Sequence, residues 1–184
     1  MSESLIDGTG TGYEAKVGID NRLSVHAITE PEDKASNVHG RTWSLPFTIT
    51  PTGAGDYFFY LKNTGNEVYS ITDIRILSGA VETIGLHVVS NTATFTAPST
   101  ITPVNRNLNS SRVPSIIVSA DTDVTGISDE GELYFLRINA VNAFEHLSSS
   151  SNIIIYKGNA VALKASVGAT VIKGMVSLTT IEER

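Results

Sequence analysis

The chain has 184 residues, of which 41% are hydrophobic and 17% are charged, and its formal net charge is −6. A chain of this length forms about one domain, or one domain with an appendage. The acidic balance argues against a nucleic-acid-binding surface, because phosphate recognition needs clustered lysine and arginine. The absence of cysteine excludes disulfides, thiolate metal sites and thiol catalysis.

The first 40 residues differ in charge from the rest. They hold seven acidic and three basic residues, a net charge of −4, whereas residues 41–184 hold twelve acidic and ten basic residues, a net charge of −2. The apolar residues in this segment are too sparse to form a core. Residues 1–40 are therefore either a flexible terminus or an arm that becomes ordered on a partner. We predict an extended N-terminal docking arm over residues 1–40 and a folded domain over residues 41–184. The candidate docking residues are Leu5, Ile6 and Tyr13.

Apolar runs separated by turn residues become regular at about residue 41. A short candidate strand over residues 23–28 precedes them, and residues 43–49 are predicted to form the first strand of the domain. Pro46 interrupts this strand. Proline cannot donate a hydrogen bond to a sheet ladder, which favours a position at a sheet edge.

Residues 56–77 organise the predicted fold. Two runs rich in aromatic and β-branched residues flank Asn-Thr-Gly-Asn at residues 63–66, which is typical of a β-hairpin with a four-residue loop. The first run is apolar without alternation, so we expect that strand to be covered on both faces. The second run changes phase, which predicts a bulge or a break near residues 72–73. A strand that bends in this way commonly passes from one sheet of a sandwich to the other.

The rest of the chain continues the pattern of short strands and turns. Residues 98–114 are predicted to form a long surface loop, and residues 121–132 are predicted to form an acidic loop. Residues 140–147 are the one stretch with a helical character. About eight strands with this spacing predict an all-β protein, a β-sandwich of jelly-roll type with an extended N-terminal arm. The remaining strands are predicted over residues 84–88, 116–118, 133–138, 153–156, 161–167 and 170–178.

No catalytic, cofactor or targeting motif is recognisable. The four histidines are far apart, so no metal site is predicted, and His87 is interpreted as a sheet-face residue because it alternates with apolar neighbours. The glycines at residues 8–12 lack the strand, helix and lysine of a phosphate loop, and no Gly-x-Ser-x-Gly elbow occurs. We expect no enzymatic activity and no cofactor. We also expect no export signal and no membrane anchor, since no apolar stretch approaches the length of a membrane span.

Two further features leave alternatives open. Carboxylates at residues 121, 123, 129, 130 and 132 are interpreted as a solvated acidic loop in preference to a calcium site, because their spacing matches no EF-hand. The aromatic residues are interpreted mainly as core, with a sugar-stacking platform as the alternative. The residues of that platform would be Trp43, Tyr57, Tyr60 and Tyr69.

Several short sequence segments, taken in their order along the chain, together resemble those of small virion structural proteins of tailed bacteriophages. The resemblance spans most of the chain, and its motifs are turn and strand signatures. The segments are Gly10-x-Gly12-Tyr-x-Ala15-x-Val17, Asn21-Arg22-Leu23, Gly55-Asp56-Tyr-Phe-Phe-Tyr-Leu61-Lys62-Asn63, Thr102-Pro103-Val104-Asn105 with Asn107 and Ser110-Ser111, Ile153-Ile154-Ile155-Tyr156-Lys157-Gly158 and a terminal strand running into Glu182-Glu183.

The resemblance implies a capsid decoration or cement protein, or a tail-associated protein, which is assembled in the host cytoplasm and resides in the virion. Its partners would be the major capsid protein or other virion proteins, and it would form a homotrimer. The arm would add extended segments to strand edges of the capsid protein. The alternative is a carbohydrate-binding or receptor-binding β-sandwich module of a phage tail, which would use residues 98–114 and exposed tyrosine or tryptophan side chains.

Overall fold

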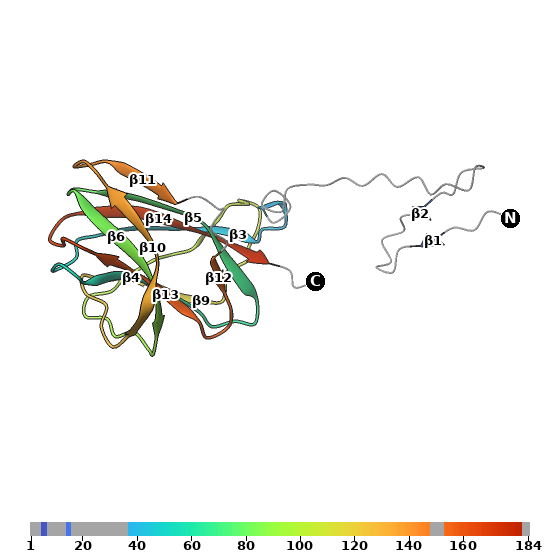
Figure 1. Ribbon diagram of the computed structural model, residues 1–184. Coiled ribbons are helices and arrows are strands. Elements are labelled where there is room, and N and C mark those ends of the chain that lie inside the picture. Colours follow the sequence, from blue (N-terminus) through green and yellow to red (C-terminus); the bar gives the residue numbers. More distant parts are fainter. Residues whose placement is uncertain (1–4, 7–13, 16–36, 148–152, 182–184) are drawn as a thin grey trace. The chain divides into compact units, whose positions relative to one another are not determined.

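The computed structural model describes residues 5–6, 14–15, 37–147 and 153–181 (Figure 1). The chain divides into two units, Met1–Pro31 and Glu32–Arg184. In the first unit, strand β1 (Leu5–Ile6) pairs antiparallel with strand β2 (Glu14–Ala15). Two of the predicted docking residues, Leu5 and Ile6, therefore form β1. Tyr13 and the predicted strand at residues 23–28 lie outside the described residues.

The second unit is built from two antiparallel sheets, so the all-β prediction is confirmed (Figure 1). The first, which we call the β6 sheet, has the strand order β10-β6-β13-β4-β9-β7. Its strands are β4 (Tyr57–Asn63), β6 (Glu82–Ser90), β7 (Ser99–Thr100), β9 (Ile116–Ala120), β10 (Ser128–Ile138) and β13 (Ala160–Ala165).

The second sheet, which we call the β5 sheet, has the order β11-β5-β14-β3-β8, and a further strand, β12, also pairs with β5. The two sheets pack as a β-sandwich-like fold around one apolar core, to which both contribute. The strands of the β5 sheet are β3 (Thr42–Ile49), β5 (Val68–Ser78), β8 (Val104–Asn105), β11 (Phe144–Leu147), β12 (Ile153–Ile155) and β14 (Ile172–Ile181).

Alternation along the strands explains which side chains enter the core. In β6, Ile84 and Leu86 are fully buried between the sheets, and the alternate residues Gly85 and His87 lie on the outer face. In β4, four successive residues from Phe58 to Leu61 are buried, as the lack of alternation predicted. Phe58, Phe59 and Leu61 belong to the main core, and the register shift in the β4–β13 pairing lies at Phe58. Tyr60 is covered by a second, smaller cluster on the outer face, where it packs with Ala162 and Phe95.

The predicted hairpin at residues 56–77 is wrong in its pairing, although both strands form. Strand β4 belongs to the β6 sheet and β5 to the β5 sheet, so the loop between them crosses from one sheet to the other. Other segments hold this crossing. The Asn63 amide donates hydrogen bonds to the carbonyl oxygens of Glu67 at 2.7 Å and Ile155 at 3.0 Å, and the backbone N–H of Gly65 donates to the carbonyl of Ser115.

The predicted irregularity near residues 72–73 is confirmed. The register between β5 and β14 shifts at Thr72, which has no partner while Ile71 and Asp73 pair with neighbouring residues of β14. On its other side, β5 pairs with β12 before this point and with β11 after it. The bulge therefore marks the place where β5 changes partners within one sheet, and not a passage to the other sheet.

Two local predictions have opposite outcomes. Pro46 lies where β3 has β14 on one side and, beyond Ser44, no pairing with β8 on the other, as expected for a proline at an edge. The helical character assigned to residues 140–147 is wrong, because residues 144–147 form β11 against β5. Pairing with an existing strand outweighs a weak local propensity over so few residues.

Candidate functional site

The outer face of the β6 sheet gathers the polar side chains of four strands. We call the group of Tyr57, His87, Asp129, Glu132 and Lys164 the His87 cluster; its members come from β4, β6, β10 and β13. The register places Lys164 opposite Tyr57 on one side and opposite Gly85 on the other, and His87 opposite Glu132. The cluster is thus assembled by strand pairing between segments far apart in sequence.

His87 lies between two carboxylates and is only 7% exposed. Its Nδ1 is 2.9 Å from Asp129 Oδ1, and its Nε2 is 3.7 Å from Glu132 Oε2. The edge of its ring meets the Tyr57 ring at a centroid distance of 5.6 Å and an interplanar angle of 87°. The sequence prediction of His87 as a sheet-face residue is confirmed, but its carboxylate partners were not predicted.

Asp129 is the acceptor on which the His87 cluster converges. Its carboxylate accepts a hydrogen bond of 2.6 Å from the Tyr57 hydroxyl and one of 3.0 Å from the backbone N–H of Gly131. The bond from Tyr57 is the main cause that lowers the pKa of Asp129 to about 2, and the bonds from His87 and Gly131 act in the same direction against partial burial. Since Asp129 is ionised at neutral pH, His87 Nδ1 carries the proton of their hydrogen bond.

The Tyr57 side chain contacts Asp129, His87 and Lys164. Burial raises its pKa above its usual range, and the hydrogen bond to the negative Asp129 raises that pKa further. The Lys164 ammonium group lies 4.9 Å from the centre of the Tyr57 ring, in a cation–π arrangement, and 3.7 Å from Asp129 Oδ2. The phenol is therefore a hydrogen-bond donor at neutral pH and not a phenolate.

Gly85 provides the space that His87 and Glu132 occupy. A Cβ atom at this position would lie 2.6 Å from His87 Nε2 and 3.3 Å from Glu132 Oε2. The first distance is too short for non-bonded atoms, so any side chain here would displace the imidazole ring. Glycine in the middle of a strand often marks such a close approach.

The His87 cluster is a network of hydrogen bonds and ion pairs that links strands β4, β6, β10 and β13. In a Ser-His-Asp triad, the nitrogen remote from the aspartate faces a hydroxyl nucleophile. Here that nitrogen faces Glu132, and within the described part of the chain no hydroxyl lies at hydrogen-bond distance from His87. The cluster instead fastens the first half of β10, which carries two register shifts, to the centre of the sheet.

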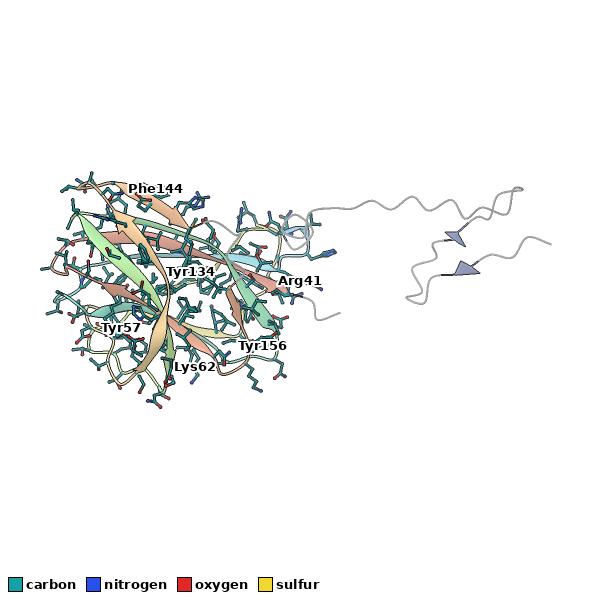
Figure 2. All side chains as sticks on the ribbon, in the orientation of Figure 1. Arg41, Tyr57, Lys62, Tyr134, Phe144 and Tyr156 are labelled. Carbon is teal, nitrogen blue, oxygen red and sulfur yellow. The ribbon has the colours of Figure 1, made fainter. Side chains whose placement is uncertain are left out.

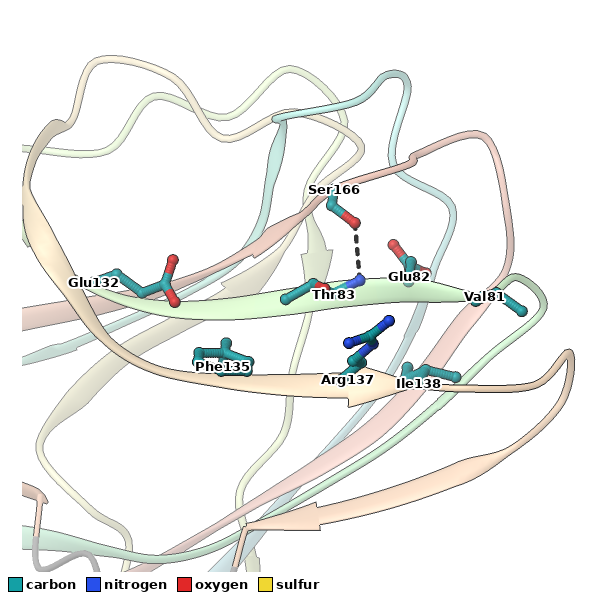
Figure 3. A pocket seen from close by; sticks show the side chains of 8 residues that line it. All are labelled: Val81, Glu82, Thr83, Glu132, Phe135, Arg137, Ile138 and Ser166. Atoms are coloured by element: carbon teal, nitrogen blue, oxygen red, sulfur yellow. Dashed lines mark hydrogen bonds between the residues drawn. The ribbon is translucent and has the colours of Figure 1, made fainter.

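An open cleft of about 510 Å³ lies beside the His87 cluster, and we call it the β10 cleft (Figure 3). Phe135 and Arg137 stand on β10, Thr83 stands on the neighbouring strand β6, and Glu132 joins the cleft to the His87 cluster. Ser166 closes another side, and its hydroxyl oxygen accepts a hydrogen bond of 2.8 Å from the Thr83 backbone N–H, the dashed line in Figure 3.

The β10 cleft combines an exposed ring with unpaired charge. The Phe135 side chain is 63% exposed. Arg137 is exposed as well, and none of the ion pairs between described residues includes it. Glu82, at the other end of the cleft, is only 4% exposed; its Oε1 accepts a hydrogen bond from the Ser78 hydroxyl, whereas its Oε2 has no donor among the described atoms.

Most of the residues considered for a sugar-stacking platform are buried, so that alternative is wrong for them. Trp43, Tyr60 and Tyr69 are each 1% exposed, and the Trp43 indole N–H donates to the carbonyl of Arg112 at 3.2 Å. Tyr57 is half-buried on the outer face, where Figure 2 labels it, and its hydroxyl is already bonded to Asp129. Interpreting most of these aromatic residues as core is thus confirmed.

The predicted acidic loop is divided between two places. Asp129 and Glu132 belong to the His87 cluster, whereas Asp121 is fully buried and accepts hydrogen bonds from the backbone N–H groups of Thr96 and Thr122, both at 2.6 Å. Burial raises the pKa of the nearby Asp123, and the charges of Asp56 and Asp121 add to that effect. The interpretation of this segment as a solvated loop is wrong for Asp121, which holds the loop after β6 against the sheet, and for residues 128–132, which belong to strand β10.

The described residues contain neither a metal-ligand group nor a membrane-spanning helix. No group of three or more histidine, aspartate or glutamate side chains is arranged to hold a metal ion in that part of the chain. Its helices include none with the length and apolar character needed to cross a bilayer.

Comparisons with known proteins add no relative. Neither a scan against protein-family models nor a search of curated proteins finds a match to this chain.

Proposed function

We propose that this chain is a structural protein of a tailed-bacteriophage particle, most simply a decoration or cement protein that docks on the major capsid protein through residues 1–40. The identity rests on the sequence resemblance described above, and the observation that carries the docking role is the size of the β1–β2 ribbon. Strands β1 and β2 have two residues each, and the sheet they form has two strands. A ribbon of that size is not stable alone in water, so it gains from adding to the sheet edge of a partner.

The second unit supplies the body of such a protein. Its two antiparallel sheets share one buried core, which suits a rigid cap, and we assign it to the jelly-roll type of sandwich. We propose that three copies associate, because a trimer matches the three-fold positions of a shell and multiplies weak single contacts. Assembly would take place in the host cytoplasm, and the mature protein would reside in the virion.

Binding to capsid shells that lack the protein tests the docking role. The variant Leu5→Asp/Ile6→Asp places two charges in β1, and we expect it to abolish co-sedimentation of the full-length chain with the shells. Leu108→Asp is the matched control, because Leu108 is 90% exposed on the second unit, and it should bind like the wild type. Equal binding of all three proteins would refute docking through β1.

Light scattering tests the proposed assembly state. A trimer has three times the mass of the 19.6 kDa chain. A mass that stays at that of one chain across the micromolar range would contradict the trimer but leave docking through β1 to the co-sedimentation assay.

A further inference from the structure

We propose that the β10 cleft binds a neutral carbohydrate chain. This site is distinct in its residues from the aromatic platform considered above, because neither Trp43 nor Tyr57 lines it. It is also separate from docking through β1. The volume of the cleft, about 510 Å³, lies within the range of about 300–1,000 Å³ that is usual for small-molecule sites.

The apolar contact would come from Phe135. The ring is mostly exposed, at 63%, although it sits in the middle of a sheet edge where a polar side chain would cost nothing. The C–H groups on one face of a sugar ring form an apolar patch, which is a suitable partner for an aromatic face. The ring would supply affinity, while its polar neighbours would supply orientation.

The polar contacts match hydroxyl groups. Arg137 presents the planar, multiple N–H donors of a guanidinium with no carboxylate of the described chain attached. Glu132 presents acceptors at the other end, where its side chain is 45% exposed. A sugar hydroxyl can both donate and accept, so one hydroxyl of an oligosaccharide can accept from the guanidinium while another donates to the carboxylate, and hydrogen bonds to charged groups are the stronger ones.

Glu82 adds an independent observation. Its carboxylate is almost completely buried, and its Oε2 lacks a donor among the described atoms. A buried acceptor without a partner is unfavourable, and Glu82 lines the cleft, so a ligand donor that reached its Oε2 would be favoured. Ser166 adds a hydroxyl whose oxygen already accepts from Thr83 and whose hydrogen is free to be donated.

The charge distribution argues for a neutral ligand. Two carboxylates, Glu82 and Glu132, line the cleft with the single guanidinium of Arg137. A phosphate or a sialic acid would bring further negative charge beside both carboxylates, and the chain as a whole carries a net charge of −6. A fully apolar ligand would exclude water from the exposed Arg137 and Glu132 side chains without replacing the hydrogen bonds to that water.

The cleft is preorganised by the His87 cluster. Glu132 lies 3.7 Å from His87 Nε2, and Gly85 leaves the space for both side chains. A ligand that uses Glu132 therefore meets a carboxylate whose position is already restricted, which reduces the entropy cost of binding.

A glycan array with neutral hexose, neutral N-acetylhexosamine and sialylated oligosaccharides tests the proposal with the full-length protein. The strongest neutral oligosaccharide is then titrated by NMR. We expect Phe135→Ala to weaken its binding at least about tenfold, which corresponds to about 1.4 kcal/mol, and Arg137→Gln to weaken it several-fold. The matched controls are Phe144→Ala, because Phe144 is 57% exposed but does not line the cleft, and Arg106→Gln, which should both bind normally.

Three results would overturn the proposal. They are the absence of any reproducible neutral glycan, equal binding by Phe135→Ala and wild type, and binding restricted to sialylated oligosaccharides. All substituted side chains are exposed, so the variants should unfold at the wild-type temperature, and a thermal scan separates loss of binding from loss of fold.

Discussion

The two faces of the β6 sheet use the same strands for different purposes. On the inner face, Ile84, Leu86 and Leu163 are at most 1% exposed and belong to the apolar core. On the outer face, residues one position away, such as Gly85, His87 and Lys164, form or adjoin the His87 cluster and the β10 cleft. The inner face is stabilised by volume and apolar area, whereas the outer face is stabilised by hydrogen bonds and charge, which pH and salt can change.

The largest effect is expected on the inner face. Leu163→Ala removes a fully buried side chain from the centre of β13 and should lower the free energy of unfolding by about 2–5 kcal/mol, as measured by urea denaturation. Lys164→Ala, the neighbouring residue on the outer face, is the control and should cost less than about 1 kcal/mol. If both variants lost the same stability, the two faces would not differ in the way described.

The second effect concerns the charge at the centre of the His87 cluster. Asp129→Asn keeps the shape but weakens the hydrogen bonds from Tyr57 and His87, and should cost about 1–2 kcal/mol at pH 7. Glu145→Gln, on β11, is a matched loss of one negative charge and should be nearly neutral.

The pH dependence of that difference gives a sharper test. The pKa of Asp129 in the folded state, about 2, lies below its ordinary value of 3.8. The charged form therefore adds stability above about pH 4, and that stability is lost as the pH falls through 2. The gap between wild type and Asp129→Asn, followed by denaturation at decreasing pH, should shrink over this window. A gap that is constant from pH 7 to pH 2 would show that the charge of Asp129 does not stabilise the cluster.

A third prediction connects the His87 cluster to the β10 cleft. Gly85→Ala forces the His87 ring away from its position and should cost about 1 kcal/mol without disturbing the inner face. NMR should show changed His87 ring resonances and unchanged core methyl resonances. Gly79→Ala is the control, because a Cβ there meets its nearest neighbour at an ordinary 3.6 Å. Unchanged His87 resonances in Gly85→Ala would refute the close approach.

The smallest effect should come from the cation over the aromatic ring. Lys164→Gln removes the contact with Tyr57 and the charge beside Asp129, for a loss of about 0.5 kcal/mol at low salt. The part that depends on Asp129 should diminish in 1 M salt, where the Debye length is about 3 Å. A loss that is the same at both salt concentrations would assign the effect to packing of the lysine stem alone.

The candidate site illustrates what sequence patterns miss. The alternation around His87 predicted that it faces away from the core, but its partner Asp129 is 42 residues away and belonged to a predicted loop. Strand β6 ends at Ser90 and β10 begins at Ser128, with β7, β8 and β9 between them, so no pattern along the chain indicates that the two strands pair. Two register shifts in β10 obscured the alternation that would have extended the strand to Ser128.

Local patterns in the sequence determined where most strands lie, that residues 58–61 are covered on both faces, and that β5 is irregular at residue 72. These properties depend on neighbours along the chain, because side chains alternate with a fixed period of two. Only the tertiary structure decided that β4 and β5 enter different sheets and that residues 144–147 form a strand. Those outcomes depend on which distant segment pairs with or covers each strand, and the same alternating pattern is compatible with many partners.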